Sequence, residues 1–180
     1  LVGLAVIGVV ASVVVDRSSG LGQGFDHYDV AFTGPVSQMM AMGDLQWRAD
    51  GVTTRAGNWI RQQRGPWFLW AHYYDPHLPY DAPAAHARAA PGRPYDAEIA
   101  HVDAEIGRLL ASVDRASTIV VVTSDHGEAL GEHGEPDHGY FLYDATLRVP
   151  LIIAGPRVPA RTVTEQVRSM DIAPTIAQLG

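Results

Sequence analysis

The chain has 180 residues, of which 47% are hydrophobic and 18% charged, and this composition excludes a disordered chain and allows one domain with its own core. A net charge of −7 without any basic cluster excludes a surface that binds nucleic acid. The absence of cysteine excludes disulfides within these residues but leaves the compartment open: cytoplasmic, periplasmic or extracellular.

Residues 1–15 are almost entirely apolar, and three interpretations compete for them. A membrane-spanning helix needs about 20 apolar residues, whereas this run stops at Asp16. A signal peptide begins with Met and a positively charged stretch, and both are missing. The Val and Ile content favours a buried strand, which we place at residues 6–15, so we expect no membrane contact from this segment. Because the first residue is Leu1, we expect the natural N-terminus to lie upstream.

Helical and strand-like patterns alternate after a turn-rich stretch at residues 18–29. Residues 48–63 place apolar side chains on one face and predict a helix. Trp67–His72 is a short apolar run after Gly-Pro, which predicts a buried strand. Residues 76–94 are rich in Pro and Ala without periodicity and predict an irregular loop.

The clearest helical pattern begins near residue 98. Its apolar positions recur at helical spacing: Ile99, Val102, Ile106, Leu109, Leu110 and Val113. Four polar side chains are expected to face outward: Glu98, His101, Glu105 and Arg108. Residues 118–123 predict a strand buried on both faces, residues 150–154 another strand, and residues 171–179 a final short helix. The alternation predicts an α/β fold with a mostly parallel sheet sandwiched by helices.

Asp125 and His126 directly follow the strand of residues 118–123, where open α/β sheets bind ligands. A carboxylate and an imidazole side by side on a tight turn can both reach one divalent cation, and Gly127 permits a sharp turn. The alternative is that Asp125 caps a following helix and His126 is merely exposed. These residues alone do not decide between the two.

Residues 127–139 combine many glycines with many ionisable side chains, so we predict a loop over the site. Three acidic side chains suit a solvated loop: Glu132, Glu135 and Asp137. We place His138 in the site, because it precedes an aromatic run at residues 140–143 that should tie the loop to the core. The role of His133 stays open.

His77 follows the strand Trp67–His72 and is flanked by Pro76 and Pro79, which restrict the backbone around it. An imidazole held there can act as a general acid for a leaving oxygen, or donate a hydrogen bond to an anion. For His72, inside the strand, we expect a core histidine whose hydrogen bonds are satisfied.

At these residues the chain resembles the sulfatase family of the alkaline-phosphatase-like superfamily. The resemblance rests on five stretches in the same order: residues 20–29, 68–80, 95–110, 118–156 and 169–175. Each stretch is weak evidence alone, whereas five in order are specific. They extend over nearly the whole chain.

The resemblance implies hydrolysis of a sulfate ester of a small molecule or a glycan. Asp125 and His126 match metal ligands, His77 matches the catalytic histidine near the leaving oxygen, and His138 stands where many members place a lysine on the sulfate. The implied cofactor is one divalent cation, Ca²⁺ first. Mn²⁺ or Zn²⁺ are alternatives, because a nitrogen ligand suits softer ions.

The family nucleophile, a formylglycine made within Cys/Ser-x-Pro-x-Arg, has no counterpart in the 180 residues, and neither has the early Asp-Asp metal pair. We therefore expect both upstream, and expect residues 1–180 to be a single partial domain, the C-terminal part of a sulfatase catalytic domain, inactive by itself. Three alternatives stay open: a phosphonate monoester or phosphodiester hydrolase, a membrane-anchored phosphoglycerol or phosphoethanolamine transferase, and a binding module without catalysis.

Overall fold

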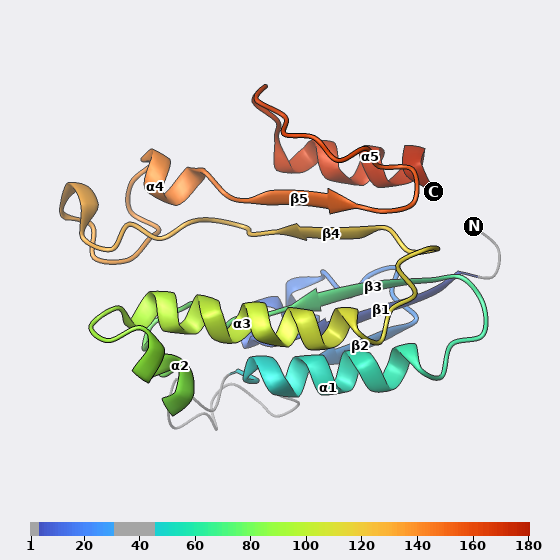
Figure 1. Cartoon of the computed structure of the whole chain (residues 1–180), viewed down its shortest axis with the longest axis horizontal. Helices are drawn as coiled ribbons and strands as arrows, with labels where there is room; N and C mark the ends of the chain where they lie inside the picture. The colour runs from blue at the N-terminus through green and yellow to red at the C-terminus, as the bar shows by residue number, and fades with distance from the viewer. Residues whose placement is uncertain (1–3, 31–45) are drawn as a thin grey trace. The chain divides into compact units, whose positions relative to one another are not determined.

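A computed structural model describes residues 4–30 and 46–180. The chain forms two compact units that divide between Val113 and Asp114, and each is described by itself as unit 1 and unit 2. Figure 1 shows the elements of both. The single partial domain expected from the sequence stays a prediction.

Unit 1 contains a parallel three-stranded sheet in the order β2-β1-β3 (Figure 1). The central strand is β1 (Ala5–Val10), flanked by β2 (His27–Val30) and β3 (Trp67–His72). The prediction of a strand over residues 6–15 was too long. After β1 the chain turns into the 3₁₀ helices η1 (Val13–Val15) and η2 (Arg17–Ser19), because the Ser12 side chain accepts a hydrogen bond from the backbone N–H of Val14.

One face of the sheet packs against α1 (Ala49–Ile60) and α3 (Pro94–Leu110). The buried residues of this cluster are Ile7, Val9, Ala11, Val52, Ala56, Ile60 and Leu109. Removing an aliphatic side chain such as Val9 from water contributes about 1.5–3 kcal/mol. The helix predicted at residues 48–63 and its apolar face are thereby confirmed.

A smaller cluster covers the opposite face of the sheet around Tyr28, which lies directly opposite Gly8 in the register of β1 and β2. A Cβ atom on Gly8 would lie 2.7 Å from Cδ2 of Tyr28, so the missing side chain makes room for the ring. The Tyr28 hydroxyl donates a hydrogen bond of 2.7 Å to the carbonyl of Val15, which ties the segment after β1 to this face.

The outward orientation predicted for Glu98 and His101 on α3 was wrong. Glu98 is 0% and His101 6% exposed, whereas Ile99 is 44% exposed. Glu98 and His101 turn inward because charged partners from other segments lie on the inner side of α3. A sequence pattern that ranks side chains only by polarity cannot detect such partners.

The loop predicted at residues 76–94 contains a short helix, α2 (Ala84–Ala89), which packs against α3. To that extent the prediction of an irregular loop was wrong. The Pro at position 94 is the first residue of α3, where a missing backbone N–H costs no helical hydrogen bond.

Unit 2 contains an antiparallel pair, β4 (Val120–Thr123) and β5 (Leu151–Ala154). The helical segments of this unit are η5 (Glu132–Gly134), α4 (Asp144–Leu147), η6 (Ser169–Asp171) and α5 (Ile172–Leu179). β4 is half-buried rather than buried on both faces as predicted, and β5 is its one strand partner within the described ranges. None of the helices in residues 4–30 and 46–180 is both long and apolar enough to cross a membrane.

Candidate functional site

Asp125 and His126 lie on an exposed turn just beyond the carboxyl end of β4. Oδ2 of Asp125 is 3.7 Å from Nε2 of His126. The other ring nitrogen of His126, Nδ1, lies 2.8 Å from the carbonyl oxygen of Gly127. Because a carbonyl can only accept, Nδ1 carries a proton, and the neutral ring keeps its lone pair on Nε2, the nitrogen beside Asp125.

The turn after His126 is fixed by close packing of the backbone against α4. Gly127 donates a hydrogen bond of 2.8 Å to the carbonyl of Thr146, and a Cβ on Gly127 would lie 2.1 Å from the carbonyl oxygen of Ala145. No α-helix follows Asp125 before α4, so the alternative reading of Asp125 as a helix cap does not hold.

His138 lies against His126, with ring centroids 4.0 Å apart and planes at 29°. Its Nδ1 is 3.1 Å from Oε1 of Glu128, a carboxylate whose side chain is 3% exposed. The structure thus brings His126, His138 and Glu128 together. From the sequence, Glu128 was counted only as one of the ionisable residues of a polar loop. Its position directly after Asp-His-Gly could have indicated that it belongs to the site.

The solvated position predicted for Glu135 was wrong. Glu135 is buried, and its Oε1 accepts hydrogen bonds from the backbone N–H groups of Tyr140 and Phe141, at 2.8 and 3.2 Å. Tyr140 and Phe141 themselves have exposed side chains. The aromatic run is therefore held through its backbone by a carboxylate, and its exposed rings do not tie the loop to a core. His133 stacks on Tyr143, with centroids 4.0 Å apart.

His77 lies in unit 1, beyond the carboxyl end of β3. Its ring stacks on Tyr74 with centroids 4.4 Å apart, and its Nδ1 lies 2.7 Å from the carbonyl oxygen of Leu78. Its backbone N–H donates a hydrogen bond to the carbonyl of Asp75. His72 is half-buried beside Trp70. The expectation of a core histidine with satisfied hydrogen bonds stays a prediction.

Sequence reasoning missed an ionic cluster formed by half-buried Arg48 and buried Asp75, Glu98 and His101. Asp75 lies two residues before His77. Nε of Arg48 is 3.1 Å from Oδ1 of Asp75, and Nε2 of His101 is 3.8 Å from the same oxygen. Burial raises the pKa of the Asp75 carboxyl, while the Ala49 backbone N–H and the Arg48 charge oppose the rise. Burial likewise raises the pKa of Glu98, against the Arg48 charge and the Asp81 backbone N–H. Asp75 lies three residues after the end of β3, and this place after a strand is the sequence feature that could have pointed to it.

His77 belongs to unit 1, whereas Asp125, His126 and His138 belong to unit 2. The convergence of all four side chains on one substrate stays a prediction.

Asp125 and His126 are placed so that they could supply two ligands of a metal ion. Two ligand atoms on one divalent ion lie roughly 3–4 Å apart, and the two side chains present an oxygen and a nitrogen at 3.7 Å. Within the described ranges no group of three or more His, Asp or Glu side chains is arranged to hold a metal ion. The pair therefore offers two ligands, and further ligands would have to come from other residues.

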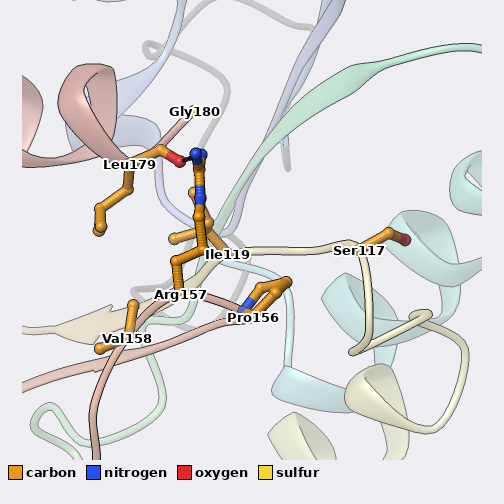
Figure 2. Close-up of a pocket in the computed structure, with 7 residues that line it drawn as sticks. All are labelled: Ser117, Ile119, Pro156, Arg157, Val158, Leu179 and Gly180. Carbon is orange, nitrogen blue, oxygen red and sulfur yellow. Dashed lines mark hydrogen bonds between the residues drawn. The ribbon is translucent and has the colours of Figure 1, made fainter.

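A hollow of about 160 Å³ lies at the other end of β4 (Figure 2). It is lined by Ser117, Ile119, Pro156, Arg157, Val158, Leu179 and Gly180. Figure 2 shows Arg157 reaching the carbonyl of Leu179. Ser117 and Ile119 precede β4, whereas Asp125 follows it, so this hollow is separate from the candidate site.

The Sulfatase family profile matches residues 12–180. The chain belongs to the sulfatase family. It is 38% identical over 78 residues to the uncharacterized sulfatase YidJ of Escherichia coli K12, a match that covers 42% of this chain and 16% of that protein. Members of the family typically use Ca²⁺ and a formylglycine.

Two solved structures share the fold of this sulfatase chain. The crystal structure of Ps i-CgsB in complex with k-i-k-neocarrahexaose matches with a TM-score of 0.71 at 19% identity, over 98% of this chain and 50% of that one. A protein in the alkaline phosphatase superfamily from Vibrio parahaemolyticus matches with a TM-score of 0.69 at 17% identity, over 97% of this chain and 44% of that one. The chain thus spans about half the length of these proteins. The predicted α/β fold with a parallel sheet is confirmed.

Proposed function

We propose that the full-length protein hydrolyses a sulfate ester of a small molecule or a glycan, with a divalent cation held in part by Asp125 and His126. The observation that carries the proposal is the oxygen–nitrogen pair at 3.7 Å beyond β4, in a chain of the sulfatase family. A cation held in part by Asp125 and His126, Ca²⁺ first, would polarise the sulfate oxygens, and a formylglycine outside residues 1–180 would supply the nucleophile.

His77 acts in this proposal on the leaving oxygen. The Leu78 carbonyl accepts a hydrogen bond from Nδ1–H, so a protonated ring carries its second proton on Nε2 and can donate that proton. Stacking on Tyr74 restricts the plane of the His77 ring. Less conformational entropy is therefore lost when the ring is oriented toward the leaving oxygen.

His138 binds the sulfate group in this proposal, in place of a lysine. The buried Glu128 carboxylate accepts from Nδ1 and fixes the ring orientation, so that a protonated His138 presents its other N–H to an anion. The stacked His126 ring supports the same orientation from one side.

The test is metal content together with turnover of an aryl sulfate by the full-length protein. Asp125→Asn and His126→Ala should each lower metal affinity or kcat/KM about 10–100-fold or more. Glu132→Gln, an exposed acid of the same loop, is the matched control and should change neither. Unchanged metal content and unchanged rates in both site variants would refute the assignment.

A second candidate is favoured by the nitrogen ligand at His126: hydrolysis of a phosphonate monoester or phosphodiester with Mn²⁺ or Zn²⁺. Rates on an aryl sulfate and on the matching aryl phosphonate, each with Ca²⁺ and with Mn²⁺, separate the two candidates. Faster phosphonate turnover with Mn²⁺ would replace the sulfate assignment.

A further inference from the structure

The segment of residues 75–81 carries His77 and is held at both ends by one side chain, Arg48 at the start of α1. Nε of Arg48 is 3.1 Å from Oδ1 of Asp75, at the first residue of the segment. Nη2 of Arg48 donates a hydrogen bond of 2.7 Å to the carbonyl of Asp81, at its last residue. Arg48 therefore bridges the two points between which His77 lies.

A second helix holds the same segment. Oε1 of Glu98 on α3 accepts a hydrogen bond of 2.7 Å from the backbone N–H of Asp81 and lies 3.6 Å from Nη2 of Arg48. His101, also on α3, lies 3.8 Å from Oδ1 of Asp75. The position of the segment is thus defined relative to α1 and α3, the two helices that pack on the sheet.

The contacts that His77 makes inside this segment are local. Its backbone bonds to Asp75, and Nδ1 to Leu78. Its ring also stacks on Tyr74, just before the segment. These contacts with neighbouring residues set the local conformation, and the two ends that Arg48 holds contribute to where the segment and its imidazole lie.

The ionic cluster is a costly way to stabilise a fold. Asp75 and Glu98 are both buried, and burying two carboxylates is unfavourable unless a cation compensates them. Apolar residues of similar volume often stabilise as well or better, whereas a planar guanidinium that reaches two separate groups adds a defined geometry. The cluster is therefore better explained by geometry than by stability.

We propose that Arg48 is a positioning residue for His77, which it aims at the leaving oxygen by bridging Asp75 and Asp81. This inference rests on the proposed role of His77 in sulfate ester hydrolysis. Arg48 is placed neither on the substrate nor on the metal.

The test compares two substrates of the full-length protein, 4-nitrophenyl sulfate with a good leaving group and an alkyl sulfate with a poor one. Loss of an aimed general acid penalises the poor leaving group, and such catalysis is worth about 10²–10⁴-fold. Arg48→Met should therefore lower kcat for the alkyl sulfate about 100-fold or more, lower it only a few-fold for the nitrophenyl ester, and leave KM nearly unchanged. His77→Gln should show the same selectivity.

Arg48→Lys is the conservative variant, because it keeps the charge but cannot bridge two groups as a planar fork does. It should retain part of the alkyl sulfatase activity. Arg61→Met is the matched control: Arg61 is exposed at the C-terminal end of α1 and bonds to Asn58 of the same helix, so both substrates should react as before. Hydrogen exchange at residues 75–81 should be faster in both Arg48 variants and unchanged in the control.

An equal loss on both substrates in Arg48→Met, while His77→Gln stays selective, would overturn this inference and spare the role of His77. Unchanged hydrogen exchange at residues 75–81 in the Arg48 variants would overturn it as well. If His77→Gln shows no leaving-group selectivity, the proposed role of His77 fails and the inference falls with it.

Discussion

Gly127 follows the two proposed metal ligands and lies against backbone atoms that cannot swing aside. Because a Cβ there would lie 2.1 Å from the Ala145 carbonyl oxygen, Gly127→Ala has to displace the turn from α4. We expect it to destabilise unit 2 by about 1–3 kcal/mol, measured by urea unfolding.

The control for this substitution is Gly107→Ala on α3, where no atom beyond the neighbouring residues and the helix's own backbone lies within 4 Å of the added carbon. Ala is favoured over Gly in a helix, so this change should stabilise by about 0.5–1 kcal/mol. Equal unfolding midpoints for wild type and Gly127→Ala would show that the turn accommodates a side chain.

Sequence alone pointed to Asp125, His126 and His77, because each follows a strand and strand ends collect functional groups in α/β sheets. Glu128 and Arg48 were not singled out. Their roles arise from contacts with His138, Asp75 and Asp81, and these pairings are set by packing rather than by local pattern.

At the scale of elements, α3 combines an apolar stripe with buried charges. Val102 belongs to the stripe and is buried, whereas its neighbour Asp103 is exposed. We expect Val102→Ala to lower the free energy of unfolding by about 1–3 kcal/mol. Asp103→Ala should stay within about 0.5 kcal/mol of wild type. Thermal and urea unfolding of both variants check this, and equal costs would contradict the orientation of the helix.

Most elements were predicted from periodicity, since α1, β3, β4, β5 and α5 arise from local apolar patterns. The errors have two physical sources. The strand β1 ended early because the Ser12 hydroxyl starts a turn inside an apolar run. Glu98 and His101 were assigned to the wrong side of α3 because ion partners distant in the chain reverse the ordinary preference of polar groups.

At the scale of the whole molecule, the ionic cluster makes stability depend on pH. Burial raises the pKa of Asp75 above 3.8 and that of Glu98 above 4.5, so the folded state holds these protons more tightly than the unfolded chain. The stability that the folded state gains from binding these two protons is fully present at a pH below those ordinary values. It is lost as the pH rises through the folded pKa values. As the pH rises above these ordinary values, wild type should lose stability relative to the double variant Asp75→Asn, Glu98→Gln.

Urea midpoints of both proteins across this range give the measurement. The double variant also loses its pairing with Arg48, which shifts its stability at every pH, so the pH-dependent difference between the curves is the quantity to compare. Exposed carboxyls with lowered pKa, such as Asp16, act in the opposite sense, but they are common to both proteins and cancel. Parallel curves would show that the cluster is not a source of pH dependence.

The fold class could be predicted because strands and helices alternate in the sequence, yet the direction of β5 could not. A short apolar run reads alike whether its partner runs parallel or antiparallel, and β5 pairs antiparallel with β4. Strand direction depends on the path of the connection between them, which carries Asp125, His126 and His138.

The close fit of the Tyr28 ring over Gly8 has a consequence for descent within the family. The two positions face each other on neighbouring strands, and any carbon added at position 8 would collide with the ring. A lineage that acquires alanine at position 8 should therefore also replace the tyrosine at position 28 by something slimmer, and the two changes should be inherited together.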